Sequence, residues 1–280
     1  SDGLEFEVYS ALDRVRQHIA NPFKNYLVPR STWRWIFRKS GSELLAESQR
    51  RPGGWKAMEI IYANNPPKNF IDEMAVSQSP YSVEIRNRKT LVTDRLAKLV
   101  RHYAESAEDL LMVSVGGGPG RYMLEGMAAN PEVQSRGVVI DFDDEAFSYG
   151  HDLQQQMELD GRVEYIKGDA RDIARHVNHA PEIVLIVGLF DYLTDPEARQ
   201  LIEVMFKNVK PGGSVLATSL SDPWHNAPFL KRAFGWDLNF RTGQYLAGMF
   251  GEAGFDIIET TETPMHIYTV VTARKDATAS

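Results

Sequence analysis

The chain has 280 residues, a formal net charge of −7 and no cysteine. The acidic balance argues against a protein that binds the phosphate backbone of nucleic acids, and the lack of cysteine excludes disulfides, zinc–thiolate sites and thiol catalysis. No run approaches the ~18 apolar residues of a membrane span, and the first residues lack the basic and apolar regions of a signal peptide. We therefore expect a globular, cytoplasmic protein that binds neither nucleic acid nor membrane.

The first 108 residues have a helical pattern with polar or Pro/Gly breaks at 21–22, 51–54 and 64–67. Apolar residues recur at helical spacing after Ser79, which predicts a long helix there. Arginines alternate with aromatic residues between Arg30 and Lys39. Such a pattern could bind nucleic acid, but an amphipathic helix with solvated arginines is the favoured interpretation. Residues 1–108 are therefore predicted to form a helical extension.

From residue 109 the pattern changes to short apolar runs that alternate with amphipathic helices. Such continuous runs are typical of a parallel sheet covered on both faces. Five predicted strands cover 110–115, 137–141, 163–167, 182–187 and 214–219. Two further β-like segments, 255–261 and 266–272, have no helix between them and predict an antiparallel hairpin. The predicted fold class is α/β, with a doubly wound, Rossmann-like, seven-stranded sheet over residues 109–280. An exposed hairpin edge permits a homodimer.

Three glycines, Gly116, Gly118 and Gly120, directly follow the first predicted strand. Glycine allows a tight turn, a close approach to a ligand and the presentation of backbone N–H groups at a helix start. The dinucleotide pattern G-x-G-x-x-G is not matched, because its last position would fall on Arg121 or Met123. The turn therefore argues against NAD as the ligand but does not indicate which other nucleotide binds.

Acidic residues follow the second and third predicted strands. Asp141 lies about twenty residues beyond the glycine turn, where a carboxylate can accept hydrogen bonds from both ribose hydroxyls. Asp143 or Asp144 can instead cap the next helix. Asp169 could accept from an adenine amino group, whereas Asp172 can cap or pair locally. These positions together predict an adenosine site at the strand ends.

The glycine turn, Asp141, the segment 168–170 and the turn 210–213 together resemble class I S-adenosylmethionine-dependent methyltransferases, over residues ~109–275. The resemblance implies that the glycines pass close to the methionine part of the cofactor, that Asp141 holds the ribose and that an aromatic ring flanks the adenine. Ser114 departs from the family, which often has an acid there. The implied cofactor residues are Gly116, Gly118, Gly120, Asp141, Phe142, Asp169, Ala170 and Gly188.

Segments 187–195 and 236–242 are similar to bacterial methyltransferases, some of which form hydroxy-fatty-acid methyl esters. Asp191 and Tyr192 follow the fourth strand, where this fold places residues near the reactive sulfonium. The Tyr192 ring could stabilise that positive charge by a cation–π interaction of roughly 0.5–2 kcal/mol. Equally, the aromatic rings of this segment could simply pack in the interior.

Methyl transfer requires alignment and exclusion of water more than acid–base groups. A carboxylate acceptor needs no base, whereas a protonated oxygen or nitrogen acceptor could use one. His225, which follows the fifth strand, is the best-placed candidate, although a single loop histidine can also be structural. Tyr81 is a candidate contact to the acceptor, and Arg86 and Arg88 could pair with an acceptor carboxylate or face solvent. No metal is expected.

Three functions follow from these residues. The first is S-adenosylmethionine-dependent methylation of a small molecule that carries a carboxylate, hydroxyl or amine, with residues 1–108 covering the cofactor and shaping the acceptor pocket. The second uses the aminocarboxypropyl arm of the same cofactor, either by cyclisation to azetidine carboxylate with release of methylthioadenosine or by nicotianamine-type transfer. The third is a binding module without activity.

Overall fold

The computed structural model describes residues 3–107 and 109–278, which group into two compact units. Unit 1 contains the described residues up to Thr90, together with Ser221–Phe240 and Glu262–Tyr268. Unit 2 contains Leu91–Leu220, Arg241–Thr261 and the residues from Thr269 onward. The boundary between the units lies inside one long helix. The predicted division at residue 109 marks instead the change from helical to strand periodicity.

Unit 1 is helical. A Ser10–Asp13 capping box starts its first helix, and left-handed Asn64, with φ 42°, ends the fourth. The α-helix ends at Pro22, at the predicted break, but the chain does not leave the helical path there. It continues as a wider π-helix to Leu27. The elements are α1 (Ala11–Pro22), η1 (Phe23–Leu27), α2 (Arg30–Lys39), α3 (Glu43–Arg50), α4 (Trp55–Ala63), α5 (Phe70–Asp72), η2 (Glu73–Ser77) and the start of α6 (Pro80–Ala104).

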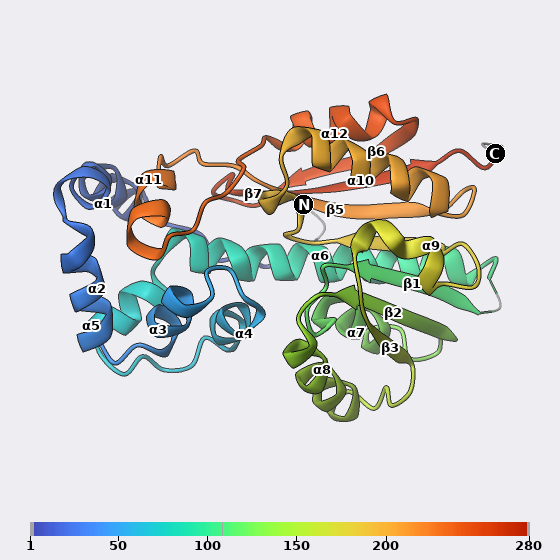
Figure 1. Ribbon diagram of the computed structural model, residues 1–280, viewed down its shortest axis with the longest axis horizontal. Coiled ribbons are helices and arrows are strands. Elements are labelled where there is room, and N and C mark those ends of the chain that lie inside the picture. Colours follow the sequence, from blue (N-terminus) through green and yellow to red (C-terminus); the bar gives the residue numbers. More distant parts are fainter. Residues whose placement is uncertain (1–2, 108, 279–280) are drawn as a thin grey trace. The chain divides into compact units, whose positions relative to one another are not determined.

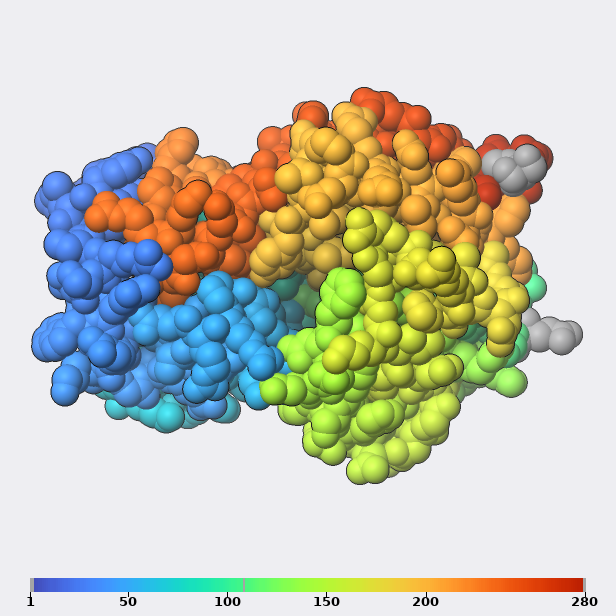
Figure 2. All heavy atoms as spheres, viewed as in Figure 1, coloured from blue at the N-terminus to red at the C-terminus, as the bar shows by residue number. Residues whose placement is uncertain are grey.

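Two later segments complete unit 1. Residues 221–240, with α11 (Ala227–Phe229) and the π-turn η5 (Leu230–Phe234), lie against the N-terminal helices, and Figure 2 shows them in orange beside blue. The Phe37 and Phe234 rings stack with centroids 4.9 Å apart in a small core. Phe37 is buried whereas the arginines of α2 are exposed, as the amphipathic interpretation predicts. Segment 262–268 joins through fully buried Glu84, whose carboxylate accepts from the Thr263 hydroxyl.

Unit 2 contains a seven-stranded sheet of order β3-β2-β1-β4-β5-β7-β6, which confirms the predicted fold class (Figure 1). The first five strands are parallel neighbours. Strand β7 is antiparallel to β5, because Lys275 bonds with Gly212 and Gly213 while Ile267 bonds with Ser221. The strands are β1 (Leu110–Val115), β2 (Ser135–Asp141), β3 (Val163–Lys167), β4 (Ile183–Ile186), β5 (Ser214–Leu220), β6 (Phe255–Glu262) and β7 (Tyr268–Lys275).

Helices cover both faces of this sheet. Leu111, Val113 and Val115 point into a core built with α10 and α12, so the alternate residues of β1 point to the other face. Helix α7 covers that second face, because a Cβ on Gly137 of β2 would meet Met123 and Met127. The helical elements are α7 (Arg121–Ala128), α8 (Asp144–Gln156), η3 (Ala170–Asp172), α9 (Ile173–His176), η4 (Phe190–Tyr192), α10 (Asp195–Asn208) and α12 (Gly243–Glu252).

Strand β6 is an edge strand, and its Ile257 and Ile258 side chains are exposed. This edge permits pairing with a second copy, so a homodimer stays a prediction. Among the described residues, no helix combines the length and apolar character that crossing a bilayer requires.

Candidate functional site

The predicted cofactor residues of unit 2 lie at one edge of the sheet. Gly116 follows β1, Asp141 ends β2, Asp169 lies two residues past β3 and Gly188 lies two residues past β4. The strands are parallel and in register, with Val115 beside Ile140 and Asp141 beside Lys167. Their carboxyl ends therefore meet at the edge where doubly wound sheets bind ligands.

The glycine turn depends on backbone conformations and space that only glycine provides. Gly116, Gly118 and Gly120 have φ values of 63°, 53° and 75°. A Cβ on Gly120 would lie 2.9 Å from the Val139 side chain, and one on Gly117 would overlap the Ser114 hydroxyl. The sequence singled out Ser114 only as a departure from a family. In the structure it is buried and packs against the turn, which makes Gly117 as necessary as its neighbours.

The carboxylate of Asp141 holds this turn. One oxygen accepts from the Gly118 N–H at 2.7 Å, and the other accepts from the Asp143 N–H at 2.9 Å. A carboxylate has about four lone-pair positions, so these two bonds leave acceptor capacity for a ligand. Asp143 caps helix α8 through the Glu145 N–H, as one of the two alternatives for this segment predicts.

Tyr165 of β3 supports the glycine turn, a role that no sequence pattern indicated. Its hydroxyl donates to the Pro119 carbonyl at 2.9 Å. Burial raises the pKa of Tyr165 to about 12, so the donor proton stays in place at neutral pH. A Cβ on Gly150 of α8 would collide with this ring, which explains a glycine inside that helix.

Asp169 already bonds with a neighbouring residue, whereas the ring of Phe142 is exposed to solvent. The Asp169 carboxylate accepts from the Arg171 side chain, which lowers the pKa of Asp169, and it also accepts from the Arg171 N–H at 2.8 Å. Ala170 begins the short η3 turn beside it. Phe142 is 67% exposed, an unusual position for an aromatic ring directly after a strand. The ring could therefore flank a flat ligand, whereas Asp169 would have to share its charge with Arg171.

The loop after β4 packs against the glycine turn. Gly188 has φ 82°, and its N–H donates to the Thr218 hydroxyl at 2.9 Å. The Leu189 side chain lies where a Cβ on Gly116 would point. Phe190 is buried against Phe250 of α12, as the interior-packing alternative predicts for that ring. In the same turn, Asp191 is 5% exposed whereas Tyr192 is 45% exposed.

Arg241 fixes the conformation of that loop, although sequence reasoning did not identify this role. The side chain is buried and donates to the Phe190 carbonyl at 2.7 Å and to the Leu193 carbonyl. Its Nε donates to the Asp195 carboxylate at 2.8 Å. One arginine thus anchors both ends of the Phe190–Tyr192 turn.

Tyr81 and His225 belong to unit 1. Tyr81 is buried, and its hydroxyl donates to the Asp222 carboxylate at 3.2 Å. Asp222 also accepts from the N–H groups of Asn226 and Ala227. The His225 side chain is exposed on a backbone with φ 53°, and its carbonyl accepts from Asn25. The structure therefore groups Tyr81 with Asp222, a residue that the sequence did not single out.

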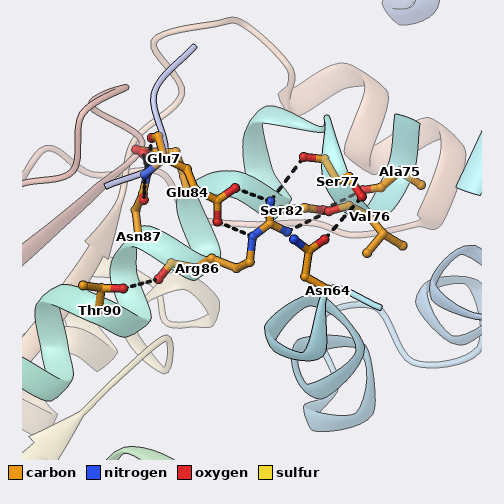
Figure 3. Close-up of polar contacts among 10 residues, drawn as sticks. All are labelled: Glu7, Asn64, Ala75, Val76, Ser77, Ser82, Glu84, Arg86, Asn87 and Thr90. Atoms are coloured by element: carbon orange, nitrogen blue, oxygen red, sulfur yellow. Dashed lines mark hydrogen bonds and ion pairs between the residues drawn. The ribbon is translucent and has the colours of Figure 1, made fainter. Parts of the chain in front are cut away.

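One of the two alternatives for Arg86 and Arg88 was that they face solvent. The structure contradicts that alternative. Figure 3 shows the Arg86 guanidinium between the Glu7 carboxylate and the carbonyls of Val76 and Ser77. Both side chains are buried, and Arg88 lies 4.5 Å from the centre of the Tyr268 ring. Arg86 thus ties the N-terminal segment and η2 to α6.

A partly buried lysine, Lys24, gives a prediction for the stability of unit 1. Burial lowers the pKa of Lys24 to about 8, although Asp222 opposes this shift. Between pH 8 and its usual value of 10.5, the unfolded chain binds this proton and the folded chain does not, so stability rises with pH in that window. Replacing Lys24 with methionine should raise the free energy of unfolding at pH 7 by about 1–3 kcal/mol.

Thermal melting of the Lys24→Met protein from pH 7 to pH 10 measures this effect. The difference from the natural chain should shrink as the pH rises, because neutral Lys24 carries no desolvation cost. Lys39→Met is the matched control, since Lys39 is exposed on α2. A constant difference across the pH range would contradict the assignment.

These residues fit an adenosine-containing cofactor. Asp141 keeps acceptor capacity at a strand end, the glycine turn excludes side chains, and the exposed Phe142 ring lies next in the chain. When bound, S-adenosylmethionine supplies a methyl group on a positively charged sulfur.

The sequence profile of a family described as "Putative methyltransferase" matches residues 59–275. The uncharacterized protein YnbC of Escherichia coli (strain K12) is 23% identical over 218 residues, which cover 71% of this chain and 36% of that protein. The chain thus spans just over one third of the length of this relative.

Two solved structures show the same fold. A possible exported protein from Bordetella parapertussis has a TM-score of 0.69 at 17% identity, over 96% of this chain and 98% of that chain. Magnesium protoporphyrin IX methyltransferase (ChlM) from Synechocystis PCC 6803, solved with bound SAH, has a TM-score of 0.58 at 14% identity, over 88% and 99%. Because the family profile covers most of the chain, this protein belongs to that methyltransferase family, and its sheet has the fold of these solved structures.

Proposed function

We propose that this chain transfers the methyl group of S-adenosylmethionine to a small molecule that carries a carboxylate, hydroxyl or amine. The observation that supports this best is the Asp141 carboxylate, which accepts from the Gly118 N–H at the carboxyl end of β2 and keeps further acceptor positions. Family membership supplies the reaction class, and the acceptor class is our inference from the residues.

In this proposal the residues of unit 2 hold the cofactor. Asp141 accepts from the ribose hydroxyls, and Phe142 covers one face of the adenine. Asp169 and Ala170 contact the edge of the adenine, with Arg171 sharing the Asp169 charge. The glycine turn and Gly188 let backbone approach the methionine part without side chains.

Asp191 and Tyr192 provide the electrostatic environment of the transfer. The carboxylate of Asp191 favours a cation near the end of β4, and the Tyr192 ring adds a cation–π interaction of about 0.5–2 kcal/mol. These groups align the cofactor and exclude water, and neither has to move a proton for a carboxylate acceptor.

Tyr81 and His225 are the residues that we propose for the acceptor. The Tyr81 hydroxyl, oriented by Asp222, can contact the acceptor, and exposed His225 can remove a proton from a hydroxyl or amine. The lack of cysteine suits a reducing compartment, so we also propose a cytoplasmic location.

Incubation with S-adenosylmethionine, followed by mass spectrometry, tests the reaction. We expect S-adenosylhomocysteine to form when an acceptor from a panel of small carboxylates, hydroxyls and amines is added, and not without it. Enzymatic release of methylthioadenosine without an acceptor would contradict methyl transfer and favour use of the aminocarboxypropyl arm. The Asp141→Asn protein is the control, since any turnover at this site should fall with it.

A further inference from the structure

Helix α1 and the π-turn η1 expose a line of apolar side chains. Leu12, Val15, Ile19, Phe23 and Tyr26, here called the outer stripe, are each between 54% and 64% exposed. They are spaced three or four residues apart, so they share one side of the helix. A stripe of this kind normally packs into a core, and a contiguous exposed one marks a surface that meets something other than water.

The opposite side of the same helix is polar and faces the protein. Asn21 is 5% exposed and donates to the Trp224 carbonyl at 2.7 Å. Asn25 is 2% exposed and donates to the His225 carbonyl at 2.6 Å. All four residues belong to unit 1. The helix is therefore amphipathic in the reverse sense, with its polar side inward and its apolar side outward.

The same segment concentrates positive charge. Residues 11–39 contain seven Lys and Arg against a single acid, Asp13, a net charge of +6 in a chain whose formal net charge is −7. The side chains of Arg14, Arg16, Arg30, Arg34, Arg38 and Lys39 are exposed. Trp35 of α2 is also 58% exposed. Exposed Leu, Ile, Phe and Trp together with basic residues in one helical segment are typical of helices that lie in the interface of an anionic bilayer.

Two other occupants fit these observations less well. A symmetric contact with a second copy would bring the same patch together on both copies, and so would place one +6 segment against another. Nucleic acid would satisfy the arginines, but the aliphatic side chains Leu12, Val15 and Ile19 would stay exposed to water.

We propose that residues 11–39 are a docking surface for the face of an anionic lipid bilayer. The outer stripe enters the boundary between headgroups and acyl chains, and the surrounding arginines contact lipid phosphates. Helix α1, with 12 residues, lies on the bilayer and does not cross it. This surface is independent of the cofactor residues of unit 2.

Sedimentation of the full chain with vesicles tests the proposal. We expect binding to vesicles of phosphatidylglycerol and phosphatidylcholine, and little binding to phosphatidylcholine alone. The double change Leu12→Ser with Ile19→Ser should lower the partition coefficient at least about tenfold, since both side chains lose apolar area. Arg34→Gln with Arg38→Gln should lower it about fivefold per charge at low salt, and this effect should vanish in high salt.

The matched control is Ile257→Ser with Ile258→Ser, which removes two exposed isoleucines from β6 of unit 2. This control should bind vesicles like the natural chain. Equal loss with the control, or binding that ignores lipid charge, would overturn the proposal. So would a dimer in sedimentation equilibrium that Leu12→Ser with Ile19→Ser dissociates while vesicles do not bind, or retention on oligonucleotides instead of vesicles. None of these outcomes depends on methyltransferase activity.

Discussion

Replacing Asp141 with asparagine should weaken the binding of S-adenosylhomocysteine by about 10- to 100-fold, because hydrogen bonds to a charged acceptor contribute about 1.5–3 kcal/mol. The amide keeps one acceptor oxygen, so it can still receive the Gly118 N–H that shapes the glycine turn. What it loses is the charge and the second acceptor oxygen that the ribose would use. Calorimetry measures the affinity directly.

A ligand comparison separates this effect from damage to the turn. The natural chain should bind adenosine more tightly than 2′,3′-dideoxyadenosine, and Asp141→Asn should reduce that preference. The matched control is Asp144→Asn, three residues after Asp141, which removes an exposed carboxylate that pairs with Lys167. Loss of affinity for both nucleosides to the same extent would show that Asp141 acts only on the turn, and unchanged affinity would remove it from the site.

The sheet could be predicted from sequence because its strands carry continuous apolar runs. The predicted strands 110–115 and 163–167 match β1 and β3 in the structure. The last strand, predicted at 266–272, begins at Tyr268 instead. His266 and Ile267 lie in the bend before it, where His266 adopts φ 58°, and their aromatic and apolar character resembles that of a strand.

The make-up of unit 1 could not be predicted in this way. Hydrophobic periodicity depends only on residues that are close together in the sequence. Residues 221–240 join unit 1 through contacts with residues that are far away in the sequence. The Asn21 contact to Trp224 and the stacking of Phe37 on Phe234 are examples. Nothing local distinguishes these side chains from those of an ordinary connecting loop.

The cofactor positions remain predictions, and they come from the combination of a glycine turn with aspartates after two neighbouring strands rather than from any one residue. The residues that support these positions could not be identified from the sequence. Tyr165 and Ser114 look like ordinary strand residues in the sequence, and their roles depend on the turn folding back over β3 and β1. Arg86 and Arg241 would ordinarily be taken as solvated charges, yet both are buried and bonded to backbone carbonyls.

Arg241 gives the second large expected effect. Replacing it with methionine should lower the free energy of unfolding by about 2–4 kcal/mol, because the buried carbonyl of Phe190 and the partly buried carbonyl of Leu193 lose a charged donor. The free energy of unfolding of Arg241→Lys should lie between those of the natural chain and Arg241→Met, since an ammonium group cannot bond with both carbonyls and Asp195 at once. Chemical denaturation of each variant measures the change.

The control for Arg241 is Arg199→Met, because Arg199 pairs with Glu252 at an exposed position where such pairs contribute at most about 1 kcal/mol. A loss of stability for Arg241→Met no larger than for this control would show that the buried bonds do not hold the loop.

The activity of the Arg241 variants adds a second criterion. Arg241 positions the Phe190–Tyr192 turn without belonging to the glycine turn, so Arg241→Lys should lower kcat while the affinity for S-adenosylhomocysteine changes less than twofold. If kcat does not fall in Arg241→Lys, the role proposed for Asp191 and Tyr192 in the transfer step loses its support.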